Sequence, residues 1–213
     1  MNKMIKMAKA KQCQLIIKNL EKRQMSGYYC ETVREAEEKI LSMIQDGDLV
    51  SWGGAITLDE MGVKEKLPMI GAKSLDVWAY KDPEEARAAK INALNADVFL
   101  TSTNAITLDG QLVNIDGTGN RIAAMAFGPR KVIVVAGVNK ITADVDSAIK
   151  RIKTDAAPPN CIRLGKQTPC AITGQCTSCK IPGETSCCST VVTRFSNRPG
   201  RMHVVLVNED MGY

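Results

Sequence analysis

The stretch that decides the fold spans residues 97–140 and reads DVFLTSTNAITLDGQLVNIDGTGNRIAAMAFGPRKVIVVAGVNK. Two short apolar runs in it, residues 98–100 and 132–136, have the length and composition of buried strands. A polar, glycine-rich segment separates them and leads into a helix that we expect to begin at Asn120. Strands that alternate with helices predict an α/β fold, with a mainly parallel sheet covered by helices on both faces.

The polar segment between these strands carries a high density of hydrogen-bonding side chains. The sequences AITL and QLVNI, joined by Asp-Gly, predict a hairpin with a two-residue turn. Asp-Gly and Asn/Gly pairs also serve as turn chemistry alone, and that interpretation stays open. The hairpin does not require the sequence IDGTGNR that follows it, however, and open α/β sheets bind ligands at the carboxyl ends of their strands. We therefore expect a ligand site formed by Asn104, Asp109, Asp116, Gly117, Asn120 and Arg121.

Two further loops are expected at the same edge of the sheet. The sequence DLVSW predicts a strand over residues 48–52, and Gly53 and Gly54 follow it at once, so that backbone amides there could approach an anion closely. A tight turn that needs glycine is an equal alternative. A second polar loop, which ends in Lys140, follows the later of the two buried strands. We expect Lys140 and Arg121 to bind a carboxylate or a phosphate.

Helices and further strands on both sides complete the α/β pattern. Capping boxes predict helix starts at Thr32 and Thr57, and Asp82-Pro83 predicts a third. We also expect helices over residues 4–25 and 143–154, and strands at residues 28–29, 74–80, 190–195 and 203–208. The sequence AAPP at residues 156–159 predicts a helix break and a boundary. The expected organisation is an α/β domain over residues 1–157, a cysteine-rich segment over residues 158–190, and strands within residues 191–213 that complete the α/β domain.

Length and charge narrow the class of protein. A chain of 213 residues suits one α/β domain of moderate size, with or without an appendage. Much of the net charge of +5 comes from lysines spaced along the first helix, which indicates a solvated helix face and no nucleic-acid partner. No apolar run approaches the roughly 20 residues of a membrane span, and the N-terminus lacks the apolar core of a secretory signal. We expect a cytoplasmic protein.

Six of the eight cysteines crowd into residues 161–188. In a reducing cytosol such crowding favours metal or redox chemistry over structural disulfides. The segment has few large apolar residues, and a metal would supply the order that a core cannot. Thiolates alone suit an iron–sulfur cluster or zinc, and a disulfide or free-thiol loop is the alternative. The expected ligands of a 4Fe–4S cluster or a zinc ion are Cys170, Cys176, Cys179 and Cys187, with Cys161 and Cys188 as possible substitutes.

Three motifs resemble a known family. They are VSWGGAITLDEMG at residues 50–62, ADVFLTSTNAITLDGQLVNIDGTGNR at 96–121 and KVIVVAGVNK at 131–140. They are similar to the LUD domain of lactate-utilisation proteins, the LutC-like group; the resemblance covers about residues 4–153, and RPGRMHVVLVNEDMGY at 198–213 resembles the family's tail. It implies a fold similar to the sugar-isomerase and coenzyme-A-transferase-like α/β fold. It also implies a role in L-lactate oxidation, usually with partner proteins that bear iron–sulfur clusters. The cysteine-rich segment departs from the simpler members and resembles a variant seen in anaerobes.

Three functions stay open at this point. The first is a redox accessory that binds a small anionic ligand and passes electrons during oxidation of L-lactate or a related 2-hydroxy acid, with Asp116 orienting the ligand or acting as a base. The second is a coenzyme-A-transferase-like or phosphosugar-isomerase-like enzyme, for which Glu60 would be the nucleophile of a transferase were it not committed to the capping box of Thr57. The third is a non-catalytic subunit whose zinc-bound tail docks a partner. The sequence decides neither whether the chain is an enzyme nor whether it forms a homo-oligomer.

Overall fold

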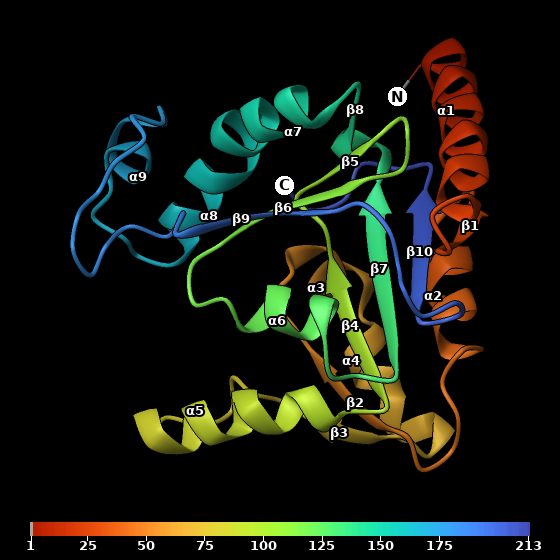
Figure 1. Ribbon diagram of the computed structural model, residues 1–213, viewed down its shortest axis with the longest axis horizontal. Helices are drawn as coiled ribbons and strands as arrows, with labels where there is room; N and C mark the ends of the chain where they lie inside the picture. Colours follow the sequence, from red (N-terminus) through yellow and green to blue (C-terminus); the bar gives the residue numbers. More distant parts are fainter. Residues whose placement is uncertain (1) are drawn as a thin grey trace.

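The computed structural model describes residues 2–213 and shows one large sheet with helices on both faces (Figure 1). The large sheet has six strands in the order β1-β10-β7-β4-β2-β3, and every neighbouring pair is parallel. These strands are β1 (Ser26–Cys30), β2 (Leu49–Trp52), β3 (Lys73–Leu75), β4 (Val98–Ser102), β7 (Lys131–Gly137) and β10 (Met202–Val207). The expected α/β class and the mainly parallel sheet are confirmed.

A second, smaller sheet has the order β8-β5-β6-β9. The hairpin expected from AITL and QLVNI forms its centre, because β5 (Ala105–Thr107) and β6 (Leu112–Asp116) pair antiparallel. On one side β8 (Ile141–Thr142) pairs with β5, and on the other β9 (Ser189–Thr193) pairs antiparallel with β6. The last two strands of the chain therefore enter different sheets, β9 the small one and β10 the large one. The pairing of β9 ties the end of the cysteine segment to the end of β6.

Helices bury both faces of the large sheet, as continuous apolar strands require. On β7, Ile133 and Val135 face α2 and α3, whereas Val132 and Val134 face α1 and α6. The helices are α1 (Lys3–Glu21), α2 (Val33–Leu41), α3 (Ile56–Met61), α4 (Val63–Lys66), α5 (Pro83–Asn92), α6 (Asn120–Ala126), α7 (Val145–Arg151), α8 (Ala157–Arg163) and α9 (Pro169–Thr173). The cysteine segment, which includes α9, projects away from the large sheet (Figure 1).

Two of the expected helix caps form as local chemistry dictates. The Thr32 hydroxyl accepts from the backbone N–H of Glu35 at 3.2 Å, and the Glu35 carboxylate accepts in return from the N–H of Glu31 at 2.8 Å. The Asp82 carboxylate caps α5 by accepting from two backbone N–H groups, with Pro83 in the first turn.

The third expected cap, at Thr57, is wrong. Helix α3 begins one residue earlier, at Ile56, and its N-terminal flank Ala55 makes no side-chain cap. Thr57 lies inside the helix and is buried, and its hydroxyl accepts from the side chain of Lys140 instead. Glu60 is consequently not part of a capping box, and its carboxylate accepts from the backbone N–H of Gly212 at 2.7 Å.

Two other local expectations also need correction. The strand expected at residues 74–80 ends at Leu75, because Asp76 closes a turn by accepting from the N–H of Trp78 at 2.9 Å.

The helix break expected at residues 156–159 does not occur. A π-helical turn, Ile152–Ala156, leads directly into α8, and the two prolines fall in the first turn of α8. A proline there lacks only an N–H that the first turn does not need. Cys161 consequently lies on a buried helix face rather than in a loop.

Candidate functional site

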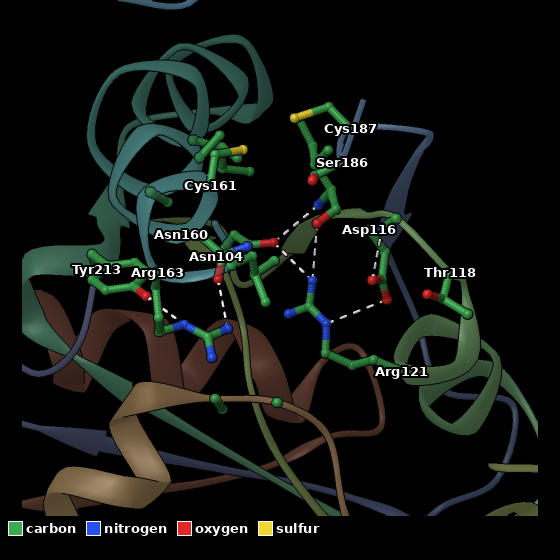
Figure 2. A pocket seen from close by; sticks show the side chains of 18 of the residues that line it. Asn104, Asp116, Thr118, Arg121, Asn160, Cys161, Arg163, Ser186, Cys187 and Tyr213 are labelled. Atoms are coloured by element: carbon green, nitrogen blue, oxygen red, sulfur yellow. Dashed lines mark hydrogen bonds and ion pairs between the residues drawn. The ribbon is translucent and has the colours of Figure 1, made fainter. Parts of the chain in front are cut away.

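A cavity of about 470 Å³ opens at the carboxyl ends of β2 and β4 (Figure 2). Its walls come from many parts of the chain. They include the loop and helix start after β2, Trp78, the end of β4, the segment from β6 into α6, Lys140, residues 152–166 around helix α8, residues 183–188 of the cysteine segment, and Tyr213. Parallel strands bring their carboxyl ends to one edge of the sheet, so loops far apart in sequence meet there. The cavity therefore lies where the sequence predicted a ligand site.

Seven of the nine residues predicted for ligand binding line this cavity. They are Gly54, Asn104, Asp116, Gly117, Asn120, Arg121 and Lys140. Gly53 lies directly behind the wall, where a Cβ atom would come within 3.1 Å of the Arg121 side chain. Asp109 lies elsewhere: at the turn of the β5–β6 hairpin its carboxylate binds Arg23 of the segment after α1 at 2.6 Å.

Arg121 organises one wall of the cavity. Its Nη1 donates to Asn114 Oδ1 at 3.0 Å, and its Nη2 donates to Asn104 Oδ1 at 2.9 Å and to the carbonyl of Ile115 at 3.0 Å. Longer contacts of 3.4 Å join its Nε to Asp116 and its Nη1 to the backbone carbonyl that ends β4. The five N–H donors of the guanidinium are thus all directed at protein acceptors. Arg121 joins the two sheets and contributes charge to the cavity, but leaves no N–H for direct contact with a ligand.

Lys140 occupies the floor of the cavity and is almost fully buried, with 2% of its surface exposed. Its ammonium nitrogen donates to Thr57 Oγ1 at 2.7 Å and to Ser102 Oγ at 2.9 Å. Burial, followed by the charges of Arg151 and Arg121, lowers the pKa of Lys140 to about 7, and Glu60 acts in the opposite direction. A titratable group that is strongly perturbed in a cavity is a candidate functional residue.

The two hydroxyl partners of Lys140 were not among the predicted site residues. Ser102 ends β4 and donates its own hydroxyl to the carbonyl of Val135 on the neighbouring strand at 2.7 Å. Thr57 was interpreted as a helix cap because its sequence fits a capping box. Their position in the sequence was the available signal, because Ser102 is the last residue of a buried strand and Thr57 follows another one closely.

Helix α8 brings a second group of basic residues to the cavity. Arg163 donates to the Tyr213 hydroxyl at 2.9 Å and to Asn160 Oδ1 at 2.8 Å (Figure 2). Lys166 donates to the backbone carbonyl of Gly183 at 2.9 Å. These residues were not predicted from the sequence, because the expected helix ends before α8 and the turn that follows it. With Arg121 and Lys140 they give the cavity four basic side chains, against the single carboxylate of Asp116. The cavity therefore favours an anion.

The cysteine segment forms the remaining wall, with Cys161, Cys187 and Cys188 lining the cavity. Although Cys187 is exposed as a residue, its thiol is partly desolvated. Burial, followed by the neighbouring thiols of Cys161, Cys176, Cys170 and Cys179, raises the pKa of Cys187 to about 11. Four other thiols of the segment therefore lie near enough to Cys187 to influence its pKa.

The sixth cysteine of the segment, Cys188, makes a different contact. Its thiol donates to the backbone carbonyl of Thr185 at 3.3 Å. Both substitute ligands expected from the sequence, Cys161 and Cys188, line the cavity together with Cys187.

The donor set fits a thiolate-bound metal in its chemistry. The backbone N–H of Ser178 donates to Cys176 Sγ at 3.4 Å, and Ser178 adopts a positive φ of 54° that aims this amide at the sulfur. The thiol of Cys179 lies 3.7 Å from the Thr185 hydroxyl. Hydrogen bonds to sulfur are how proteins orient thiolate ligands and tune an iron–sulfur cluster. Within residues 2–213, however, no three cysteine, histidine or acidic side chains lie in a metal-binding arrangement.

Comparison with known proteins identifies the family. Residues 13–207 match the family model described as the LUD domain. A crystal structure of a DUF162 family protein from Deinococcus radiodurans is similar in fold, with a TM-score of 0.51 at 12% identity, and the match covers 93% of this chain and 98% of that one. The eIF2B delta protein of Chaetomium thermophilum gives a TM-score of 0.37 at 18% identity, over 55% of this chain and 50% of that one. No curated protein matches the chain. Across residues 2–213, no helix is both long and apolar enough to cross a membrane.

Proposed function

The chain belongs to the LUD-domain family, and we propose that it is a lactate-utilisation protein that acts as a redox accessory in the oxidation of L-lactate or a related small 2-hydroxy acid. The observation that supports this role most strongly is that one cavity is lined both by four basic side chains and by cysteine thiols. A small carboxylate bound in such a cavity would lie next to the cysteine segment. The expected iron–sulfur partner proteins would then receive the electrons.

The ligand-binding half of this proposal rests on the charges in the cavity. Lys140, with its two hydroxyl partners, lies on the floor of the cavity, Arg163 lies on the wall formed by α8, and Asn120 adds an amide. Asp116 already accepts from Gly117 N at 2.9 Å and from Arg121, so it would orient the wall and could take a proton from a 2-hydroxy acid only after losing these contacts.

The metal-binding half of the proposal rests on the donor set. Cys170, Cys176, Cys179 and Cys187 would hold the metal, with Cys161 or Cys188 able to replace one of them. A 4Fe–4S cluster would supply an electron acceptor, whereas zinc would supply structural order alone. All eight cysteines are unpaired in the structure, which suits a reducing compartment. A cytoplasmic location stays a prediction.

Metal content in cysteine variants tests the proposal. We expect protein purified without oxygen to contain iron and sulfide in near-equal amounts, and the double variant Cys176→Ser/Cys179→Ser to lose nearly all of both, because zinc and iron–sulfur sites need each thiolate ligand. The matched control is Cys30→Ala, which changes a buried cysteine of β1 far from the segment and should keep the metal. Metal that is retained by the double variant, or absent from the unchanged protein, contradicts the proposed role.

A phosphosugar-isomerase-like activity is the second candidate, and the size of the cavity favours it. A volume of about 470 Å³ lies within the range of roughly 300–1,000 Å³ seen for ligands of drug size, and exceeds what a three-carbon acid needs. The transferase alternative fits less well, because Glu60 does not line the cavity and its carboxylate is occupied by Gly212 N. Turnover of ribose 5-phosphate by protein stripped of metal would favour the isomerase, and turnover of acetyl-coenzyme A would favour the transferase.

A further inference from the structure

Within residues 2–213, the ammonium group of Lys140 forms no ion pair with a carboxylate. Its two hydrogen-bond partners, Thr57 and Ser102, are neutral hydroxyls. Lysine is almost never fully buried without a paired charge, because removing an ammonium group from water costs several kcal/mol. The side chain nevertheless lines the cavity, so that its third hydrogen-bonding position is open to a bound molecule.

The charged groups packed around Lys140 do not supply the missing counterion. Arg121 of α6 and Arg151 of α7 are both cations that act against a charged Lys140, and Glu60 of α3 is the one acid that favours it. The carboxylate of Glu60 is exposed and binds Gly212 N. Asp116, on the opposite wall, binds Arg121. A positive charge on the floor of the cavity is therefore disfavoured in the free protein, and an arriving anion would stabilise it.

We propose that a carboxylate group of the ligand is the counterion of Lys140, and that the ligand binds together with one proton. This inference rests on the proposed binding of a small anion in the cavity and deepens it. The neutral amine of Lys140 takes one proton from solvent, and the resulting ammonium pairs with the carboxylate as the ligand enters. One proton and one negative charge therefore enter the site together. The two hydroxyls of Thr57 and Ser102 accept from the amine in either state and hold its nitrogen in place.

The pH dependence follows from linkage. Free Lys140 titrates near pH 7, whereas a carboxylate beside it would raise this pKa by favouring the charged form. Above pH 7 the ligand must bring its proton from solvent, so affinity should fall about tenfold for each further pH unit. Below pH 7 the ammonium is already present, and the affinity should level off.

Proton uptake on binding is the direct test. Acetate, L-lactate and pyruvate stay ionised from pH 6 to pH 8, so any acid needed to hold the pH constant when a saturating amount of one of them is added reports uptake by the protein. We expect about 0.9 proton per chain at pH 8 and about 0.1 at pH 6 for those that bind. Uptake that is equal at the two pH values, or no binding by any of the three, overturns the inference.

Variants assign the proton to Lys140. Lys140→Met should abolish both the uptake and its pH dependence, whereas the matched control Lys150→Met, on the exposed face of α7, should keep them. Lys140→Arg provides a second test, because arginine carries a permanent charge. Any carboxylate that this variant binds should bind without proton uptake. Uptake that survives in Lys140→Met or Lys140→Arg overturns the assignment.

The metal-free double variant Cys176→Ser/Cys179→Ser separates this inference from the proposed function. It should still take up a proton with acetate, because neither cysteine contacts Lys140. A chain that takes up the proton but carries no metal would overturn the redox role and leave the counterion role of Lys140 standing. A chain that carries metal but takes up no proton would overturn the counterion role of Lys140 and leave the redox role standing.

Discussion

Replacing Arg121 with methionine is expected to lower the free energy of unfolding by about 3–5 kcal/mol, the range for breaking a buried ion pair by removing one partner. The Arg121 side chain is 11% exposed and Asp116, its partner, is 15% exposed. Methionine would leave the carboxylate of Asp116 without its cation. It would also remove the donors that join Asn104 and Asn114 across the wall of the cavity. Denaturant unfolding of the two proteins measures the difference.

A matched control separates this effect from a general loss of charge in the cavity. Arg163→Met removes a cation from the opposite wall, where the residue is exposed and donates to only two side chains. Exposed polar contacts contribute little, so we expect a loss of at most about 1 kcal/mol. Equal losses in the two variants would mean that Arg121 does not hold the sheets together, and would return it to the role of a direct ligand for the anion.

Replacing Lys140 with methionine is expected to stabilise the protein. The pKa of Lys140 falls from an ordinary value of 10.5 to about 7 on folding. Each pKa unit corresponds to about 1.4 kcal/mol. Burial of Lys140 therefore lowers the free energy of unfolding by about 5 kcal/mol at a pH where the amine is protonated in both the folded and the unfolded protein. The variant loses two hydrogen bonds, at about 1 kcal/mol each. The expected net gain in the free energy of unfolding is about 2–3 kcal/mol at pH 6.

The sign of the pH dependence makes this prediction specific. The folded pKa lies below the unfolded one, so the cost is fully present below pH 7 and disappears as the pH rises towards 10.5. The advantage of Lys140→Met should therefore shrink between pH 7 and pH 10, as denaturant unfolding at a series of pH values would show. A variant that is less stable than the unchanged protein at pH 6 would show that Lys140 already has a counterion. A gain in stability with a loss of ligand binding is the usual mark of a functional residue.

The sequence predicted the elements whose signals are local. The apolar runs at β4 and β7 predict buried strands directly from their composition. The Asp-Gly turn between β5 and β6 specifies a hairpin from its own sequence. The caps at Thr32 and Asp82 are satisfied within a few residues of themselves. Such features form in the same way wherever the rest of the chain lies, which is why they could be read in advance.

The features that failed are those that tertiary contacts decide. Thr57 has the sequence of a cap, but its hydroxyl is taken by Lys140, a residue 83 positions away. Asp109 has the sequence of a site residue, but it lies at the far end of the hairpin beside Arg23. Pro158 has the sequence signal of a helix break, but the preceding π-helical turn continues into α8 and places this proline in the first turn of that helix. The contact of Arg163 with Tyr213 depends on the helix that results.

The visible absorption spectrum of protein purified without oxygen should be recorded before and after addition of L-lactate. It tests whether a small carboxylate binds beside a redox-active metal held by Cys170, Cys176, Cys179 and Cys187. We expect a broad visible band that loses intensity when L-lactate is added. A colourless protein, or a band that saturating L-lactate leaves unchanged, would contradict it.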